Sequence, residues 1–580
     1  MNTIGTSRLV GLAAVGILLL AWAPCFVVAS DRVTGQPFAT RSPVISEHGM
    51  VASAHPMASR IGIEILEQGG NAIDAAIAVN AALGFMEPTG CGVGGDLFAL
   101  VYSAAEEKIY GLNASGRSPR SLTYEQMKSD LAALGKKQIP LFHGLGVSVP
   151  GTVSGWVALR ASFGTMPMDE ILAPAIRAAE QGVPLPQVIA YYFGRSKSRY
   201  EHLPEWIALY GDKDGNLPGE GDIFRNPLLA NTYRRIAKEG AKGFYEGPVA
   251  AAIEAIVKKH GGYITAQDLA EHRAEFVDPV GVDYRGHTLW ELPPNGQGIA
   301  ALQMLRILEP YDLASMGHNS AEALHLLVEA KKLAFEDRAR YYADPAFADV
   351  DVKRLVSREY AAERRKLIDP KKAQASYAPG EGVLEHGDTT YLCVVDKHRN
   401  MVSLIQSNYT GFGSGLVPEG TGFTLQNRGN LFSMEEGHPN VYAPGKRPFH
   451  TIIPAMVSGP DGRPCFAYGV MGGAMQPQGH VQVLVNLIDF GMNVQEAGDA
   501  ARFRHGGSSQ PTDERMTDGG VLYLESGVSP DVAAALGKLG HKVAETNGGY
   551  GGYQGIWVDW KRGVLLGGSE SRKDGMALGY

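Results

Sequence analysis

Cysteine is scarce in this chain of 580 residues, and its four cysteines, Cys25, Cys91, Cys393 and Cys465, are widely spaced. Such a set gives no disulfide framework. The chain has no CxxC or HExxH pattern, and its 16 histidines show no pair at the spacing of metal ligands, so we expect neither a metal site nor a cofactor. The GxSxG pattern of a serine-hydrolase nucleophile is also missing, which argues against that mechanism.

A basic excess is missing as well. Lys and Arg number 53 against 61 Asp and Glu, a net charge of -8, which argues against nucleic acid or an anionic membrane as partner and favours a small molecule or peptide. Aromatic residues make up only 8%, whereas glycine is frequent at 73 residues. We therefore expect many tight turns and close backbone approaches.

A long apolar run occurs only at the start of the chain. Residues 1–30 have the pattern of an export signal, with Arg8, an apolar run over 9–22 and small residues before Ser30. No later stretch holds 18 uncharged apolar residues, so we expect a soluble protein in the periplasm or outside the cell. An uncleaved N-terminal anchor and a lipid on Cys25 are the open alternatives.

The residues after this signal predict helices followed by a strand. Apolar positions recur at helical spacing over 56–82 and are interrupted by Gly69 and Gly70, which predicts two helices, the second beginning near Asn71. The GCGVGG cluster at 90–95 leads into a strand over 96–102. Although the cluster matches GxGxxG, it follows a helix and enters a strand, the reverse of a dinucleotide site, so nucleotide binding is not expected.

The middle of the chain predicts a helix-rich stretch over 121–374, including an amphipathic helix over 321–342 with Leu324, Leu327 and Phe335 on its apolar face. Residues 374–388 combine one proline, three glycines and little periodicity, which predicts an exposed and mobile linker. Two strands with alternating character, 389–396 and 401–407, then form a predicted hairpin.

The hairpin begins abruptly with two hydroxyl residues, Thr389 and Thr390. A threonine hydroxyl is too weak a nucleophile to attack an amide unaided, but a free α-amine, with a reference pKa of about 7.7–8.0, can serve as its general base. Cleavage between Asp388 and Thr389 would create that amine. A structural pair of strand threonines is the alternative, because threonine is favoured in strands.

The pairing of the hairpin suggests a partner for this hydroxyl. If Asp396 faces Met401 across the turn, Thr389 lies opposite Asn408 and beside Ser407, within about one residue. Ser407 is therefore a candidate hydrogen-bond partner of Thr389.

A second candidate element is the sequence GVMGGA at 469–474, followed by an apolar stretch over 481–485. This pattern predicts a strand, a glycine-rich turn and a helix. The backbone N–H groups of such a turn can be directed at the oxyanion that develops during acyl transfer. A tight turn without a function is the alternative.

Several motifs in this order resemble those of the γ-glutamyltranspeptidase family of N-terminal nucleophile hydrolases. The resemblance covers nearly all of the chain after the signal. The motifs are GGNAID at 69–74, the glycines at 90–95, VPGTV at 149–153, GFYEG at 243–247, EAKKLAFEDR at 329–338, GDTTY at 387–391, GKRP at 445–448, MGG at 471–473 and SRKDG at 571–575.

The resemblance implies an α+β fold, the αββα sandwich of N-terminal nucleophile hydrolases, in a precursor that cuts itself. Residues 31–388 would form a helix-rich large subunit and residues 389–580 a small subunit, together a heterodimer, with a dimer of heterodimers as an open alternative. It also implies roles for individual residues. Thr389 is the nucleophile, Ser407 stands where the family usually has a supporting threonine, Gly472 and Gly473 form the oxyanion hole, and Arg117 holds a substrate carboxylate.

The sequence departs from the family pattern at the substrate pocket. Leu431 occupies the position of an aspartate that holds the substrate α-amine, although Asn430 or the nearby Glu435 and Glu436 could compensate. Further departures are Tyr409 for asparagine, Arg428 where glutamine is common, and His450 and Thr451 for paired serines.

Arg428 and His450 would suit a substrate with an extra carboxylate or a compact anion, and a buried structural role for His450 is the alternative. The stretch over 433–450 is also shorter than in transpeptidases with a lid loop, which favours hydrolysis over transfer. These departures resemble a sub-branch with lidless γ-glutamyl hydrolases, oxamate amidohydrolase and cephalosporin-acylase-like members.

We therefore predict a self-processing, exported amidohydrolase that acts through an acyl-enzyme at Thr389, with γ-glutamyl amides such as glutathione as default substrates. An oxamate-like monoamide, or the acyl side chain of an amide antibiotic, is the alternative substrate on the same scaffold. A non-catalytic exported binding protein and a transferase that attaches a polymer to cell-wall amines remain open.

Overall fold

The computed structural model describes residues 30–377 and 388–580. The predicted export signal, apart from Ser30, and most of the predicted linker lie outside the described residues. Residues 30–40 belong to a short unit of their own, in which Arg32 Nη1 donates a hydrogen bond to the Thr40 carbonyl. Residues 41–580 form a single compact unit, which carries every feature discussed below.

Two antiparallel sheets of seven strands each form the centre of this unit. In spatial order, the first consists of β1 (Val44–Ser46), β18 (Val564–Ser569), β17 (Gly552–Asp559), β13 (Pro464–Met471), β12 (Ala455–Ser458), β9 (His287–Glu291) and β8 (Val280–Tyr284). The second consists of β19 (Met576–Gly579), β2 (Met50–Ser53), β10 (Asp388–Val395), β11 (Met401–Tyr409), β3 (Asp96–Ser103), β4 (Lys108–Ala114) and β7 (Glu275–Val277). They pack face to face, since Gly469 on β13 leaves room for the ring of Tyr391 on β10.

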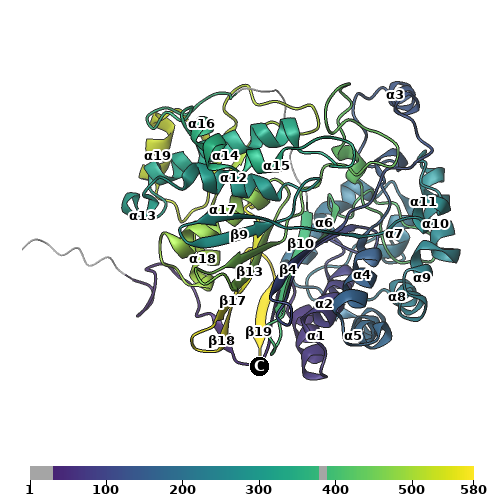
Figure 1. Cartoon of the computed structure of the whole chain (residues 1–580). Coiled ribbons are helices and arrows are strands. Elements are labelled where there is room, and N and C mark those ends of the chain that lie inside the picture. Colours follow the sequence, from purple (N-terminus) through teal and green to yellow (C-terminus); the bar gives the residue numbers. More distant parts are fainter. Residues whose placement is uncertain (1–29, 378–387) are drawn as a thin grey trace, which may run out of the picture. The chain divides into compact units, whose positions relative to one another are not determined.

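Helices cover the outer face of each sheet, as Figure 1 shows. Against the second sheet lie α1 (Pro56–Glu67), α2 (Ala72–Met86) and α4 (Thr152–Phe163), with α5 (Met168–Gln181) and α8 (Pro227–Glu239) outside them. Against the first lie α12 (Gly298–Leu308), α17 (Met475–Ile488) and α18 (Val494–Asp499), with α14 (Ala321–Tyr341) packed on α12. The predicted αββα sandwich is therefore confirmed.

The remaining elements lie around this sandwich. They are α3 (Tyr124–Ala133), α6 (Gln187–Tyr200), α7 (Pro204–Tyr210), α9 (Lys242–Tyr245), α10 (Gly247–Lys259), α11 (Ala266–Ala270), α13 (Leu313–Met316), α15 (Val352–Leu355), α16 (Arg358–Arg365), α19 (Pro530–Lys538), and the short strands β5 (Val183–Pro184), β6 (Ile223–Phe224), β14 (Phe503–Gly506), β15 (Val521–Leu524) and β16 (Val543–Ala544).

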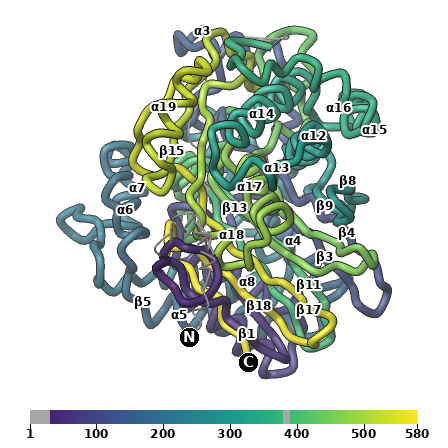
Figure 2. The backbone as a smooth tube through the Cα atoms, turned by 90° about the vertical axis from the view of Figure 1, so that its left-hand side faces the viewer, coloured from purple at the N-terminus to yellow at the C-terminus, as the bar shows by residue number. Residues whose placement is uncertain are grey.

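The two predicted subunits are interleaved in both sheets. Strands β10 and β11, which follow position 388, lie between β2 and β3 from the preceding part of the chain. At the C-terminus, Tyr580 accepts hydrogen bonds from the backbone of His48 and Gly49, so this end lies beside β1 and β2 (Figure 2). A cut before Thr389 would leave β10 and β11 paired with β2 and β3, with only Asp388 of β10 on the other fragment.

Local sequence signals explain how α2 is placed against the hairpin. Asn71 and Asp74 form a reciprocal capping box at its N-terminus, which satisfies N–H groups that a helix end leaves open. Ala72 N also donates to Asp396 Oδ2 at 3.0 Å. All fifteen residues of α2 are buried, and its many alanines let it lie close to the sheet. The predicted pair of helices and the strand after them are confirmed.

Two predictions for the middle of the chain need correction. Helix α14 is buried on all sides from Ala323 to Ala339, because it lies among α12, α19 and the segment over 505–510, so it is not amphipathic. The start of the predicted mobile linker is anchored: Gln374 O accepts from Lys332, and Tyr377 is buried with its hydroxyl bonded to Glu329.

The structure also describes the state of the cysteines and the character of the helices. Among the described residues, Cys91, Cys393 and Cys465 are buried and form no disulfide, and burial raises the pKa of the Cys465 thiol to about 12. No helix in the described part of the chain is both long enough and apolar enough to cross a membrane.

Candidate active site

Thr389 is fully buried at the start of β10, where this strand meets β11. The observed register pairs Val395 with Met401 and Thr390 with Gln406, which differs by one residue from the assumed pairing of Asp396 with Met401 and lies within the margin that the prediction allowed. The shift brings Thr389 to Ser407: the Thr389 Oγ1 hydroxyl donates to Ser407 Oγ at 3.3 Å. The contact between these two hydroxyls is therefore present in spite of the one-residue difference in register.

The glycines at 90–95 surround this end of the hairpin. Asn408 N donates to the Gly90 carbonyl at 3.2 Å, and a Cβ on Gly90 would lie 3.4 Å from the carbonyl carbon of Thr389. At Gly95 a Cβ would come within 2.4 Å of Asn408 Oδ1. The cluster thus allows a close approach of backbone to the predicted nucleophile, which explains its glycines without a phosphate ligand.

Tyr409 ends β11 with a φ of +78°, a left-handed conformation that is rare for a bulky residue. Its backbone N–H donates to Ser407 Oγ at 2.8 Å, so this hydroxyl is held between Tyr409 and Thr389. The Tyr409 ring lies 5.4 Å from the guanidinium of Arg428. Backbone outliers of this kind concentrate at functional sites, which supports the inclusion of Tyr409 in the pocket.

Two buried charged residues beside the threonines were not found from the sequence. Thr390 Oγ1 donates to Glu87 Oε2, and Lys573 Nζ lies 3.7 Å from Glu87 Oε1. Glu87 directly follows the end of α2, so its position ahead of the glycine cluster is the only sequence signal that pointed to it.

The predicted glycine turn joins β13 to α17 as expected. Gly472 and Gly473 both have positive φ, +120° and +57°, and the hydrogen bonds that hold the turn use their carbonyl oxygens, which accept from Met475 N and Gln297 Nε2. Gln297 is in turn held by Arg338 Nη1 at 2.6 Å. A braced turn that keeps its N–H groups out of these bonds suits an oxyanion hole.

A buried cluster of charge lies beside Tyr409. The Arg428 Nε is 3.6 Å from Asp96 Oδ2 and its Nη1 donates to Thr451 Oγ1 at 3.2 Å. Within the described part of the chain, Nε and Nη2 of Arg428 have no hydrogen-bond acceptor. Burial lowers the pKa of Arg428 to about 10, so it stays charged at neutral pH. A buried cation with unsatisfied N–H groups suits a carboxylate ligand.

His450 contributes to this cluster through Asp96. Its Nε2 lies 2.9 Å from Asp96 Oδ2, and its Nδ1 lies 2.9 Å from the Pro448 carbonyl and 3.2 Å from Asn295 Nδ2. Burial and the neighbouring Arg428 lower the pKa of the imidazole. With both ring nitrogens engaged inside the protein, His450 orients Asp96, which favours the structural alternative over direct contact with a substrate.

Replacing Asp96 with Asn should lower the free energy of unfolding by about 3–5 kcal/mol, because the buried Arg428 guanidinium loses its carboxylate partner. Urea unfolding of the purified variants measures this. As a control, Glu271→Gln breaks the exposed ion pair with Arg120 and should cost less than about 1 kcal/mol. Equal losses in the two variants would contradict a special role for the buried pair.

Leu431, where the family pattern has an aspartate, lies in the same short helical turn as Arg428, residues 428–431. Leu431 is buried, and Asn430 beside it holds a buried Oδ1 that has no hydrogen-bond partner among the described residues. Glu435 and Glu436, the other suggested substitutes, pair with Arg515 and Lys128 at the surface. Of the three suggested substitutes, Asn430 is thus the one whose side-chain acceptor has no partner among the described residues.

The structure does not bring Arg117 to this cluster. Its Nη2 lies 3.0 Å from Glu275 and its Nη1 3.5 Å from Asp344, and it also donates to the Gly445 carbonyl. A guanidinium paired with two carboxylates has little capacity left for a substrate carboxylate. The neighbouring Ser115 instead accepts a hydrogen bond from Asn295 Nδ2, which also lies 3.2 Å from His450 Nδ1.

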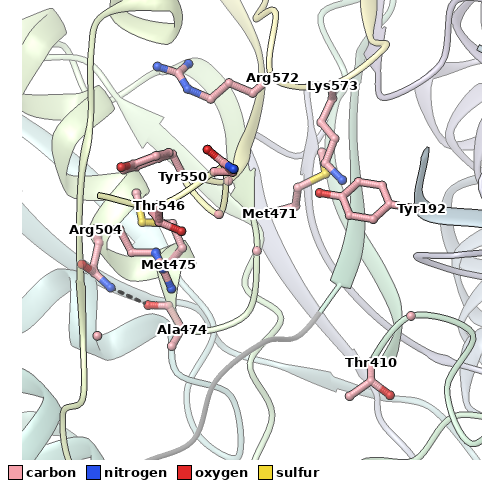
Figure 3. A pocket seen from close by; sticks show the side chains of 18 of the residues that line it. Tyr192, Thr410, Met471, Ala474, Met475, Arg504, Thr546, Tyr550, Arg572 and Lys573 are labelled. Carbon is pink, nitrogen blue, oxygen red and sulfur yellow. Dashed lines mark hydrogen bonds between the residues drawn. The ribbon is translucent and has the colours of Figure 1, made fainter. Parts of the chain in front are cut away.

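A cavity of about 800 Å³ opens beside the hairpin and the glycine turn. Thr89, Thr410 and Gly472 line it. Thr89 adjoins Gly90 and Thr410 adjoins Tyr409 in the chain, whereas Thr389 itself is fully buried and does not line the cavity. Figure 3 shows Arg504 and Tyr192 on opposite sides of the cavity, with Arg572 and Lys573 along one edge. None of Tyr409, Arg428, His450 or Thr451 lines it, so the Arg428 cluster lies outside this cavity.

Hydrogen bonds hold the short segment over 433–450 in place, so it does not act as a free loop over the site. Asn440 Nδ2 donates to the carbonyls of Leu431 and Pro511, and Lys446 Nζ donates to two carbonyls within the segment. Its residues lie against α3 and the 511–513 stretch through Tyr442 and Ser433. This agrees with a segment too short to act as a lid.

One buried cluster that the sequence did not reveal could offer metal ligands: His325, Glu329 and His541, whose donor atoms lie within 4.8 Å of one another. The two histidines are hydrogen bonded at 2.8 Å, and Glu329 accepts from Lys332 and Tyr377. These groups satisfy each other, so their geometry is explained without an ion.

The sandwich of two helix-covered sheets, with a buried threonine starting a central strand opposite a glycine turn, is the architecture of the N-terminal nucleophile hydrolases. Within this class the assignment is narrower. The family model for gamma-glutamyltranspeptidase matches residues 58–580, and the chain belongs to this family.

Known relatives carry names for several amide substrates. The chain is 36% identical to the glutathione hydrolase-like YwrD proenzyme of Bacillus subtilis, over 92% of this chain and 99% of that protein. It is also 36% identical to the oxamate amidohydrolase proenzyme of Klebsiella pneumoniae, again over 92% and 99%. The structure of cephalosporin acylase from Bacillus halodurans matches with a TM-score of 0.86 and 41% identity, over 95% of this chain and 99% of that one. The chain is thus an amidohydrolase of this family, and its substrate is the open question.

Proposed function

We propose that this chain is an exported precursor that cuts itself before Thr389 and then hydrolyses an amide whose acyl group carries a carboxylate. The observation that carries the proposal is the position of Thr389 at the start of a central strand, with its hydroxyl 3.3 Å from Ser407. The names of the relatives as proenzymes support the cleavage, and the pattern of residues 1–30 supports export.

The chemistry follows from the groups around Thr389. Once the α-amine is free, it takes the hydroxyl proton while Oγ attacks the amide carbonyl, and the N–H groups of Gly472 and Gly473 stabilise the oxyanion. The tetrahedral intermediate expels the amine, which receives the proton, and leaves an ester on Thr389. Water then attacks the ester, its proton passes through the α-amine back to Oγ, and the acid leaves. The short segment over 433–450 favours water over a competing amine.

Arg428 supports an acyl group that carries a carboxylate. Its unsatisfied guanidinium nitrogens match a carboxylate in size and charge, and the neighbouring Asn430 Oδ1 could accept an α-amine. Both groups are present in a γ-glutamyl residue, so we propose γ-glutamyl amides such as glutathione as the first substrates. Glutathione hydrolases among the relatives support this choice.

A second candidate is a compact monoamide such as oxamate. The observation that favours it is the apolar Leu431 where an α-amine would need a charged partner. A compact anion needs only Arg428, and an acyl side chain that ends in a carboxylate has the same requirement.

Steady-state rates with a panel of amides decide between these candidates. We expect γ-glutamyl-p-nitroanilide and glutathione to be hydrolysed with a kcat/KM at least about 100-fold above that for oxamate, because only the γ-glutamyl group uses both Arg428 and Asn430. Release of p-nitroaniline and of ammonia measures the two reactions. Turnover of oxamate alone would overturn the γ-glutamyl proposal and leave the compact-anion candidate.

A further inference from the structure

The large cavity next to Gly472 has a strong excess of positive charge. Among the described residues that line it are six cationic side chains and one carboxylate, that of Glu525. The cations are Arg195, Arg199, Lys331, Arg504, Arg572 and Lys573. For a chain with a net charge of -8, such a concentration of one sign in one place needs an explanation. We call this space the cationic cavity.

Three of these six cationic side chains are bonded to other groups of the protein. Arg572 is bonded to Glu525 and Glu570, and Lys573 lies 3.7 Å from Glu87. Lys331 is buried and bonded to His505 and Ser508, and burial holds the pKa of its amine well below the usual value. These three therefore contribute little free charge to the cavity.

The other three, Arg195, Arg199 and Arg504, form no ion pair within the described part of the chain. Arg195 and Arg199 are exposed and lie four residues apart on α6, so they present their charges on one face. The Arg504 guanidinium lies 4.4 Å from the centre of the Tyr523 ring, and its buried Nε has no hydrogen-bond acceptor among the described residues. Guanidinium groups held in place without a carboxylate partner favour an anionic ligand.

The position of the cavity says which part of a substrate it would take. The proposed oxyanion turn at Gly472 lines it, whereas the Arg428 cluster does not. Since the carboxylate of the acyl group is proposed to bind at Arg428, outside the cavity, we place the other side of the scissile amide in the cationic cavity, which Gly472 borders. A volume of about 800 Å³ is in the range that holds a ligand the size of a short peptide.

We infer that the cationic cavity binds the amine portion of the amide substrate and that this portion is an acidic peptide, with its carboxylates on Arg195, Arg199 and Arg504. This inference rests on the proposed function for its position in the reaction, but the binding of an acidic peptide can be tested without any turnover.

The test uses triglutamate and trialanine as probes of the purified native protein, whether it is obtained as two fragments or as one uncut chain. Calorimetry at low salt should show triglutamate binding at least about tenfold tighter than trialanine, with the difference shrinking as salt is raised. The double variant Arg195→Gln/Arg199→Gln and the single variant Arg504→Gln should each lose most of this preference. Lys197→Gln is the matched control, because it removes the same charge from α6 at a residue that does not line the cavity.

Inhibition kinetics test whether the acidic peptide binds on the amine side of the scissile amide. Triglutamate should compete with an amide that has a peptide leaving group and raise its KM without lowering kcat. Equal affinity for the two tripeptides, or a preference that the arginine variants keep, would overturn the inference. Tight binding of triglutamate without competition would overturn its place on the amine side. If the native protein neither cuts itself nor hydrolyses any amide, the proposed function fails, while the calorimetry still decides what the cavity binds.

Discussion

The Thr389→Ala variant should remain a single uncut chain, whereas the native precursor should yield two fragments, the smaller one beginning at Thr389. The alanine lacks the hydroxyl that must attack the preceding carbonyl, and no other group near position 389 offers both a nucleophile and a terminal amine. Amide hydrolysis should fall by roughly 10³-fold or more, as expected when a covalent nucleophile is removed. Intact mass and N-terminal sequencing measure the cleavage directly.

Two matched variants separate this chemistry from a folding defect. Thr390→Ser keeps the hydroxyl that bonds to Glu87 and should still be cut and active, although it lies next to the site. Thr389→Ser keeps a nucleophilic hydroxyl and should still be cut, at a lower rate. A native chain that stays whole for days at neutral pH, and binds its ligand equally well with Ala at 389, would instead support a non-catalytic binding protein on this scaffold.

The cut should leave the sandwich intact, because β10 and β11 lie between β2 and β3. The two fragments are therefore expected to stay together as a heterodimer, each supplying strands that the other needs.

Local sequence patterns predicted the elements near the site because their causes are local. The capping residue Asn71, the glycine turn and the alternation along the hairpin each act within a few residues. The one-residue difference in register has a local cause too. Asp396 Oδ1 accepts from the backbone of His398 and Asn400, so this residue organises the turn and leaves the strand pairing to begin at Val395.

The charged cluster of the pocket could not be predicted in this way. Asp96 and His450 are 354 positions apart and meet only because β3 and the segment before β12 come together across the two sheets. No local sequence pattern predicts that Asp96 pairs with Arg428. Nor does one predict that the guanidinium of Arg117 pairs with Glu275 and Asp344. A resemblance to a family gives such positions only to within the accuracy of its alignment.

Arg428→Gln should lower kcat/KM for an amide with a carboxylate on its acyl group by about 10²–10³-fold, because the substrate charge would be buried without its partner. The matched comparison is an amide of the same length with a neutral acyl end, for which the variant should change kcat/KM by less than about threefold. The ratio of the two rates thus isolates the carboxylate contact from any general loss of activity. Thermal melts of the variant show whether Asp96, left without its cation, has weakened the fold.

The same pair of substrates decides between the two arginines that have been considered for this contact. Arg117→Gln should leave the ratio close to that of the native protein, since Glu275 and Asp344 already neutralise its guanidinium. If Arg117→Gln reduces the ratio of the two kcat/KM values and Arg428→Gln does not, the substrate carboxylate binds at Arg117 and the buried Arg428 has a structural role. If only Arg428→Gln reduces the ratio of the two kcat/KM values, the substrate carboxylate binds at Arg428, and the burial of this cation accounts for the strength of the discrimination. A fully buried charge, two of whose nitrogens lack a hydrogen-bond acceptor among the described residues, discriminates between a carboxylate and its neutral analogue far more strongly than a partly exposed one.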